Sequence, residues 1–227
     1  MKYNKVCKIA AFDLDGTLLD SADDLIYSLN LLLKEKNQSP MKKSNIYRLV
    51  GNGALAMIRE AYKLNSNNEK DIDWKKLQER FLEIYKTQFL NKSTLYPHTK
   101  DTLKSLREND IKMIVVSNKP SYFVNKILEH YKISKYFDAV SGGDTFGYRK
   151  PDPKHLFSTI EQTGIKKYSC CFIGDSINDA LCAKKANVRL ILLKHGYSLH
   201  NLDKFNADYV LSNLKNLASK ICKLLYE

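Results

Sequence analysis

Four short runs of apolar residues recur along the chain, each bounded by charged or polar positions. They lie at residues 8–12, 111–117, 169–175 and 188–194. Continuous apolar runs of this length are typical of strands in a parallel sheet that is covered on both faces. A shorter run at 207–211 predicts an edge strand.

Helical patterns alternate with these runs. They cover residues 99–109, 121–131, 152–164 and 176–187. The segment 211–227 predicts a closing helix with one apolar face, formed by Leu214, Leu217, Ile221 and Leu224. Alternating strands and helices predict an α/β fold, a doubly wound parallel sheet with right-handed crossovers.

Residues 20–95 break the alternation, because they contain helical patterns and no convincing strand. The clearest pattern has apolar positions at three- and four-residue spacing: Leu77, Phe81, Ile84, Tyr85 and Phe89. The segment lies between the first strand and the next helix of the sheet domain. We therefore expect a core domain over 1–19 and 96–227 and an inserted, all-helical cap (lid) domain over 20–95.

The composition is that of an ordinary globular protein. The chain has 227 residues, 44% of them hydrophobic and 27% charged, and no apolar stretch approaches the roughly 20 residues of a membrane span. Its first residues hold too short an apolar segment for a signal peptide, so we expect a cytoplasmic protein. The five cysteines form no C-x-x-C pair and are predicted to be free thiols.

The net charge of +12 bears on possible partners. It could indicate a nucleic-acid partner, or a field that gathers anionic substrates. The lysines are scattered along the chain, without a basic block or an aromatic-interleaved basic stripe. We therefore favour a solvated basic surface and expect no nucleic-acid partner.

Polar residues follow three of the predicted strands. Asp13 ends the first, Ser117 and Asn118 the second, and Asp175 the third, with Asp179 one helical turn later. Ligands of open parallel sheets bind at the carboxyl ends of the strands, so these side chains should converge. Grouped carboxylates favour Mg²⁺, although each aspartate alone could instead be a helix N-cap.

The order of these groups resembles the four signature motifs of the haloacid dehalogenase superfamily of phosphohydrolases. The motifs here are DLDGT (13–17), the strand-end Ser117, Lys150 in RKPDP, and GDSIND (174–179). The superfamily has a Rossmann-like core, and an all-helical insertion between the first two motifs resembles one of its cap types. The resemblance implies an Mg²⁺-dependent phosphoric monoester hydrolase that forms an aspartyl-phosphate.

The resemblance also implies roles for the two aspartates of the first motif. Asp13 would be the nucleophile, and Asp15 would protonate the leaving alkoxide and then activate water. Two residues along an extended chain bring side chains to the same side, and a turn at Gly16 would let backbone N–H groups approach the phosphoryl oxygens.

The remaining implied residues are donors, cations and metal ligands. Ser117 and Asn118 would bind a phosphoryl oxygen, and Lys150 would offset charge. Thr17 would hold the phosphate or only cap the turn. The implied metal ligands are the side chains of Asp13 and Asp175 and the backbone carbonyl of Asp15, with Asp179 acting through water or by orienting Lys150.

Further stretches resemble the phosphoglycolate phosphatase branch of the superfamily: VGNG (50–53), VSNKP (116–120), SGGDTF (141–146) and RKPDP. In that branch a small phosphorylated acid binds between cap and core. Gly51, Asn52 and Gly53 would present donors to its carboxylate at a helix N-terminus, or would only link two cap helices. Further candidates for this end of the substrate are Arg48, Arg59 and Lys119.

The sequence leaves alternatives open. Relatives with the same core hydrolyse pyrophosphate, sugar phosphates, nucleotides or amino-sugar acid phosphates, and fold alone does not fix the substrate. A β-phosphoglucomutase-like phosphomutase and a non-catalytic binding protein are the other classes. We predict hydrolysis of 2-phosphoglycolate to glycolate and phosphate, by a monomer or homodimer that binds a small phosphorylated metabolite and neither nucleic acid nor a membrane.

Overall fold

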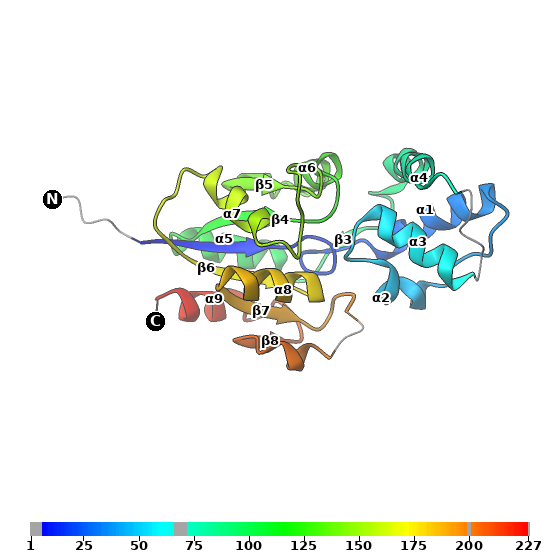
Figure 1. Ribbon diagram of the computed structural model, residues 1–227. Helices are drawn as coiled ribbons and strands as arrows, with labels where there is room; N and C mark the ends of the chain where they lie inside the picture. Colours follow the sequence, from blue (N-terminus) through cyan, green and yellow to red (C-terminus); the bar gives the residue numbers. More distant parts are fainter. Residues whose placement is uncertain (1–5, 66–71, 199–200, 227) are drawn as a thin grey trace.

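The computed structural model of the protein describes residues 6–65, 72–198 and 201–226, apart from the side chain of Arg48. Figure 1 shows a sheet flanked by helices at one end of the molecule and a group of helices at the other. Both termini of the chain lie at the sheet end, away from the helical group. None of the helices in the described residues has the length and apolar character that a membrane crossing requires.

Six parallel strands form the main sheet, in the order β5-β4-β1-β6-β7-β8. In that order they are Ala139–Ser141, Lys112–Val116, Cys7–Phe12, Tyr168–Gly174, Arg189–Leu193 and Tyr209–Leu211. The predicted α/β fold with a doubly wound parallel sheet is confirmed. The first strand of the chain is central, because β1 pairs with both β4 and β6.

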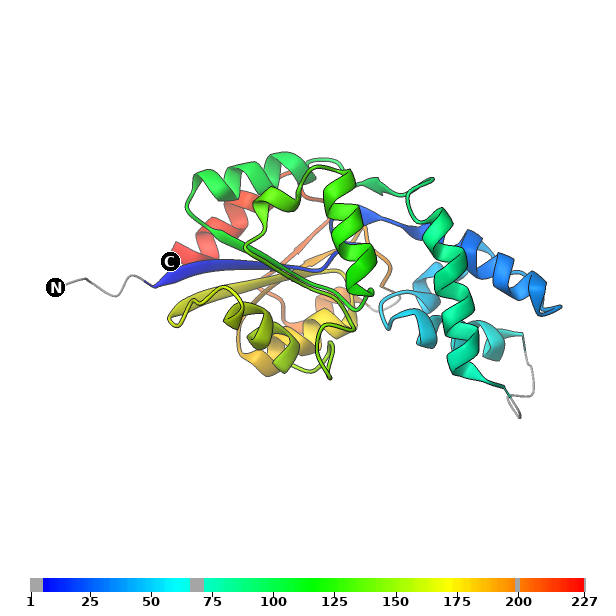
Figure 2. The ribbon, with the colours of Figure 1, turned by 90° about the horizontal axis from the view of Figure 1, so that it is seen from above.

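Helices cover both faces of this sheet (Figure 2). One face packs against α5 (Thr99–Glu108), α6 (Ser121–His130) and α9 (Leu217–Tyr226), and the other against α7 (Lys154–Glu161) and α8 (Ile177–Ala186). Side chains of β1 alternate between the two hydrophobic clusters, Phe12 in the first and Ala11 in the second. Burial on both faces explains why these strands are continuously apolar.

The second group of helices lies between β1 and α5 in the chain. It contains α1 (Ala22–Glu35), α2 (Ile46–Leu49), α3 (Ala54–Leu64) and α4 (Trp74–Gln88). Short 3₁₀ helices are η1 (Lys43–Asn45) here and η2 (Ser134–Tyr136) and η3 (Leu202–Phe205) in the sheet-bearing part. The apolar face predicted for 77–89 is buried. It belongs to the hydrophobic cluster that also contains Phe12 of β1.

A two-stranded antiparallel sheet connects the two parts: β2 (Leu19–Asp20) pairs with β3 (Thr94–Leu95). The expectation that 20–95 holds no strand was therefore wrong at its two ends. Strands of two residues are too short to leave an alternating pattern in the sequence.

Two other local expectations differ from the structure. The chain from 211 does not continue as one helix, because β8 ends at Leu211 and α9 begins only at Leu217. Within α9, Leu225 is fully buried where Leu224 was expected to be. The five cysteines are free thiols, as predicted.

Candidate active site

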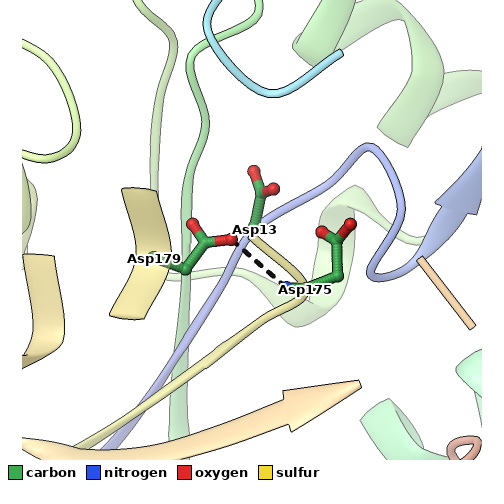
Figure 3. A group of neighbouring side chains, drawn as sticks. All are labelled: Asp13, Asp175 and Asp179. Atoms are coloured by element: carbon green, nitrogen blue, oxygen red, sulfur yellow. Dashed lines mark hydrogen bonds between the residues drawn. The ribbon is translucent and has the colours of Figure 1, made fainter. Parts of the chain in front are cut away.

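The carboxyl ends of three neighbouring strands place their polar residues together. Asp13 follows β1, Ser117 follows β4 and Asp175 follows β6. Figure 3 shows the side chains of Asp13, Asp175 and Asp179 close together, with Asp13 on the chain that leaves β1. One oxygen of each of these three buried carboxylates lies within 4.8 Å of the others. The convergence predicted from the strand-end positions is present.

A single lysine lies among these carboxylates. Lys150 Nζ is 2.8 Å from Asp13 Oδ1 and 2.7 Å from Asp179 Oδ1, and its side chain is 2% exposed. Although burial alone would lower the pKa of Lys150, the charges of Asp13 and Asp179 raise it above its usual range. One lysine against three carboxylates leaves two negative charges uncompensated. A divalent cation fits this balance, since buried charges require partners.

The protonation of the carboxylates reflects the same excess of negative charge. Burial raises the pKa of Asp13 to about 7, with Lys150 opposing and Asp179 adding to the rise. Burial, and then the charges of Asp13 and Asp179, raises the pKa of Asp175 well above its usual range. A cation bound here would favour the ionised form of both groups, so the residues present fit a magnesium site.

Asp179 uses both of its carboxylate oxygens within the protein. Oδ1 accepts from Lys150, and Oδ2 accepts from the backbone N–H groups of Asp175 and Ser176 and from Ser176 Oγ. Ser176 is the N-cap of α8, and its hydroxyl accepts in turn from the Asp179 N–H. Of the roles implied for Asp179, orienting Lys150 therefore has the support of the geometry. Neither Asp175 nor Asp179 is the N-cap of α8, and Asp179 takes part instead as the third helical residue of the capping box that Ser176 begins.

Asp175 fills a space that only residues without a side chain leave open. A Cβ on Gly16 would lie 2.3 Å from Asp175 Oδ2, and one on Gly196 would lie 2.2 Å from Asp175 Cβ. Thr17 Oγ1 donates to Asp175 Oδ1 at 3.1 Å, and the Tyr197 N–H donates to Oδ2 at 2.7 Å. These contacts fix the carboxylate toward Asp13.

Thr17 and Gly16 of the first motif both have partners within the protein. Thr17 is not among the residues that line the cleft, and its hydroxyl positions Asp175 instead of holding the phosphate. The Gly16 N–H donates to the Leu19 carbonyl at 2.8 Å, so the turn itself uses this donor. Gly16 is required here for its φ of 86° and for the close approach of Asp175.

Asp15 forms an ion pair with Lys119, which belongs to none of the four signature motifs. Both oxygens of Asp15 lie 3.0 Å from Lys119 Nζ, and Ser21 Oγ donates to Oδ1 at 2.6 Å. Lys119 Nζ also donates to Tyr85 Oη of α4 at 2.7 Å. The helical group thus reaches Asp15 through Tyr85 and Lys119.

A cleft of about 50 Å³ opens beside Asp13 and Asp15. Its polar lining on the sheet side comes from these aspartates and from Ser117, Asn118 and Lys119. Its wall on the helical side is mostly apolar and includes Leu25, Leu49, Val50, Ala54, Met57, Phe81, Leu82 and Tyr85. The small volume and the apolar wall favour a small ligand that is shielded from water.

The loop at 51–53 is tied to the sheet domain. The Gly51 carbonyl accepts from Asn118 Nδ2 and Asn178 Nδ2, each at 3.0 Å. Gly51 and Gly53 line the cleft, and α3 begins directly after Gly53. Asn52 does not line it: its side chain is exposed, and Oδ1 accepts from Asn178. The expected contact of Asn52 with substrate is therefore not supported.

Ser117 and Asn118 have the burial expected of phosphate ligands. Ser117 Oγ accepts from the Lys119 N–H at 3.3 Å, which leaves its hydroxyl proton available to an oxygen in the cleft. Asn118 Nδ2 also donates to the Lys150 carbonyl at 3.0 Å, so both of its protons have acceptors. Among the described residues, Asn118 Oδ1 is the buried side-chain atom that lacks a partner.

A histidine that sequence reasoning missed fixes the loop of Lys150. The Lys150 N–H donates to His155 Nδ1 at 3.3 Å, and His155 Nε2 lies 2.9 Å from Ser141 Oγ. Burial, and then the charge of Lys150, lowers the pKa of His155 to about 4, so the ring is neutral. With Nδ1 as acceptor, the proton resides on Nε2 and is donated to Ser141.

Tyr197 was missed as well. Its hydroxyl accepts from the backbone N–H groups of Ser21 and Ala22 and donates to Asp20 Oδ1 at 2.7 Å. Tyr197 thus joins the start of α1 to Asp175, which its own N–H contacts. A tyrosine in a loop after the fourth predicted strand carries no sequence signal for this contact.

The structure separates the three cationic candidates for the acid end of a substrate. Lys119 lines the cleft. The Arg59 guanidinium lies over the Trp74 ring, 5.1 Å from its centroid, and does not line the cleft. The side chain of Arg48 lies outside the described residues.

Comparisons with known proteins agree with this geometry. A family model for haloacid dehalogenase-like hydrolases matches residues 10–193. The chain is 35% identical over 225 residues to the phosphoglycolate phosphatase of Agrobacterium fabrum, covering 99% of this chain and 97% of that protein. It is 36% identical over 194 residues to phosphoglycolate phosphatase 1 of Pseudomonas aeruginosa, covering 84% and 71%. A crystal structure of a predicted phosphoglycolate phosphatase from Haemophilus somnus superposes with a TM-score of 0.86, at 27% identity over 97% of this chain and 99% of that one.

Proposed function

This chain belongs to the haloacid dehalogenase-like hydrolases, and from that membership we propose that it hydrolyses 2-phosphoglycolate to glycolate and inorganic phosphate. The chain is a phosphatase, a phosphoric monoester hydrolase whose relatives include phosphoglycolate phosphatases. One observation carries the proposal for this site: Asp13 and Asp15 face a small cleft together with Ser117 and a buried cation, Lys119.

We propose Asp13 as the nucleophile. Its carboxylate oxygen attacks phosphorus, the bond from phosphorus to the glycolate oxygen breaks, and an aspartyl-phosphate forms. Lys150, 2.8 Å from Asp13 Oδ1, holds this carboxylate in place and offsets the charge of the transferring group. Ser117 donates its hydroxyl proton to a phosphoryl oxygen, and Asn118 positions the loop of Lys150 through the Lys150 carbonyl.

We propose Asp15 as the acid and base. In the first step it gives a proton to the departing glycolate oxygen. In the second step it accepts a proton from the water that attacks the phosphorus of the aspartyl-phosphate, which releases inorganic phosphate and restores Asp13. Each cycle thus consumes one water and leaves both carboxylates as they began.

We propose that Asp13, Asp175 and the backbone carbonyl of Asp15 hold Mg²⁺, with Asp179 fixing Lys150 beside them. When bound, Mg²⁺ neutralises phosphoryl charge and helps align the phosphate with the nucleophile. Thr17 and Tyr197 serve this site by orienting Asp175.

We propose that residues 20–95 act as a cap over a core formed by 1–19 and 96–227. The apolar wall of the cleft belongs to this segment and excludes water from the phosphoryl group. The N-terminus of α3, which begins after Gly53, faces the cleft and suits the acid end of the substrate. We further propose a cytoplasmic monomer or homodimer that binds neither nucleic acid nor a membrane.

The experiment is phosphate release, with and without Mg²⁺, from 2-phosphoglycolate, pyrophosphate, sugar phosphates, nucleoside monophosphates and N-acetylmuramate 6-phosphate. We expect 2-phosphoglycolate to lead in kcat/KM and EDTA to remove the activity. A different leading ester would overturn the substrate and leave the aspartate chemistry standing. Isomerisation without free phosphate would indicate a phosphomutase.

A further inference from the structure

Lys119 is buried at the edge of the cleft. Its side chain is 4% exposed, and among the described residues that line the cleft it is the one lysine or arginine. Lys150, the other buried lysine nearby, is occupied by Asp13 and Asp179. A buried ammonium group requires an anionic partner, and here that partner is Asp15.

The same ion pair restrains Asp15. Lys119 Nζ donates to both carboxylate oxygens at 3.0 Å, and Ser21 Oγ donates to Oδ1 at 2.6 Å. A carboxylate held on both oxygens by one ammonium group has to give up that partner before it can approach a leaving oxygen. Removal of Asp15 alone would leave Lys119 buried without a counter-ion, which is costly.

We propose that the carboxylate of the substrate replaces Asp15 as the partner of Lys119, and that this exchange frees the Asp15 side chain to take up a proton from solvent and carry it to the leaving oxygen. The inference rests on the proposed function and deepens it. An acid end on the substrate is then required for turnover as well as for affinity, because an ester without it leaves Asp15 paired with Lys119.

Tyr85 holds Lys119 in place during the exchange. Its hydroxyl accepts from Nζ at 2.7 Å, and Nζ lies 4.7 Å from the centroid of its ring. Burial raises the pKa of Tyr85 to about 12, so the hydroxyl stays protonated and cannot itself replace the carboxylate as counter-ion. Leu25, Met57 and Phe81, which line the cleft on the same side as Tyr85, offer the incoming carboxylate no competing donor from their side chains.

The test compares two esters that differ only at the acid end. They are 2-phosphoglycolate and 2-hydroxyethyl phosphate, in which a CH₂OH group stands in place of the carboxylate. In the wild-type protein kcat/KM should favour 2-phosphoglycolate. In Lys119→Met the ratio of kcat/KM for 2-phosphoglycolate to kcat/KM for 2-hydroxyethyl phosphate should fall by about 10- to 100-fold. This fall is equivalent to the loss of one charge-assisted contact. Because Lys119→Met removes the partner of the substrate carboxylate and at the same time releases Asp15, most of the loss for 2-phosphoglycolate should appear in KM, and kcat for 2-hydroxyethyl phosphate should rise.

Matched variants separate recognition from general damage. Lys119→Arg keeps the charge and should retain most of the preference for 2-phosphoglycolate. Tyr85→Phe removes the hydroxyl that holds Lys119 Nζ and should lower this preference by less than Lys119→Met does. If Lys119→Met does not fold, as judged by its thermal unfolding, Lys119→Gln measures the same ratio.

The outcomes distinguish this inference from the proposed function. A wild-type preference for 2-phosphoglycolate that survives unchanged in Lys119→Met, or an equal fall for both esters, overturns the role of Lys119 alone. A wild-type protein that turns over both esters equally well overturns the role of Lys119 and the proposed substrate together.

Discussion

Each buried carboxylate of the site is held by a different set of partners. Asp13 is bound to Lys150, Asp15 to Lys119, and Asp175 to Thr17 and the Tyr197 N–H. The two lysines therefore separate the proposed nucleophile from the proposed acid and base, although only Leu14 lies between the two aspartates in the chain. Since all three residues are aspartates, the residue type alone does not predict which partner holds which carboxylate.

The proposed nucleophile, Asp13, gives the first prediction. Asp13→Asn keeps the size of the side chain and removes its nucleophilic oxygen, so phosphate release should fall by about 10⁴-fold or more while the fold is kept. Steady-state phosphate release and circular dichroism measure the two effects. Asp101→Asn on the exposed side of α5 is the control and should retain full activity. Turnover within about tenfold of the wild-type rate would contradict the aspartyl-phosphate mechanism.

The elements of the core could be predicted from the sequence more readily than the contacts between them. The four continuous apolar runs agree with β1, β4, β6 and β7 within one residue at each end. The three-residue strand β5 was missed, because Ala139 and Val140 are only half-buried and carry no strong pattern.

The same difference in signal applies to the site. Residues at strand ends were found, because topology brings all strand ends of a parallel sheet to one edge. The contacts of Lys119, Tyr197 and Asn178 depend on how the helices of 20–95 lie against that edge, which periodicity does not encode. The sequence predicts substrate contacts for Asn52 and Thr17 because both stand in motifs whose other residues are predicted to contact substrate. In the structure the side chain of Asn52 contacts Asn178, and that of Thr17 contacts Asp175.

The loop between α2 and α3 gives the second prediction. Asn178→Ala removes one of the two donors to the Gly51 carbonyl and the donor to Asn52 Oδ1. Hydrogen bonds contribute about 0.5–1.5 kcal/mol each, so the loss of two should lower kcat/KM for the best substrate by about 5- to 160-fold. The matched control is Asn125→Ala, whose exposed amide bonds only within α6. Equal kcat/KM in Asn178→Ala and wild type would show that this loop does not need to be held.

At the scale of the whole molecule, the helices of 20–95 and the sheet-bearing part meet through aromatic side chains as well as through the cleft. The ring centroid of Phe123 on α6 lies 4.9 Å from the ring centroid of Tyr85 and 5.2 Å from that of Phe89. Phe12, at the end of β1, belongs to the same hydrophobic cluster. Opening of the cleft therefore has to expose part of a continuous apolar core, which favours the closed arrangement.

The whole fold also responds to the charge of the site, which gives the third prediction. The pKa of Asp13 is raised to about 7 and that of Asp175 is also raised, so without a cation these groups stabilise the fold when protonated. For Asp13 this contribution is present below about pH 4 and is lost as the pH rises through about 7. Mg²⁺ would replace the protons, so the increase in Tm on adding Mg²⁺ should grow from about pH 5 to about pH 8.

Thermal unfolding with Mg²⁺ and with EDTA across this pH range measures the effect. Asp175→Asn should abolish the Mg²⁺-dependent increase in Tm, and the exposed Asp203→Asn should keep it. An increase that is the same at both ends of the range would contradict a cation among these buried carboxylates.

The central position of β1 has a consequence for synthesis of the chain. Thr17, just after β1, bonds to Asp175 across 158 positions, and β1 cannot complete its pairing until β6 exists. At the roughly 5–20 residues per second of translation, β1 waits about 8 to 30 s for that partner. During this interval the nascent chain carries an apolar strand with an unpaired edge. Ribosome-bound chains that end before β6 should therefore depend on chaperones and have no phosphatase activity.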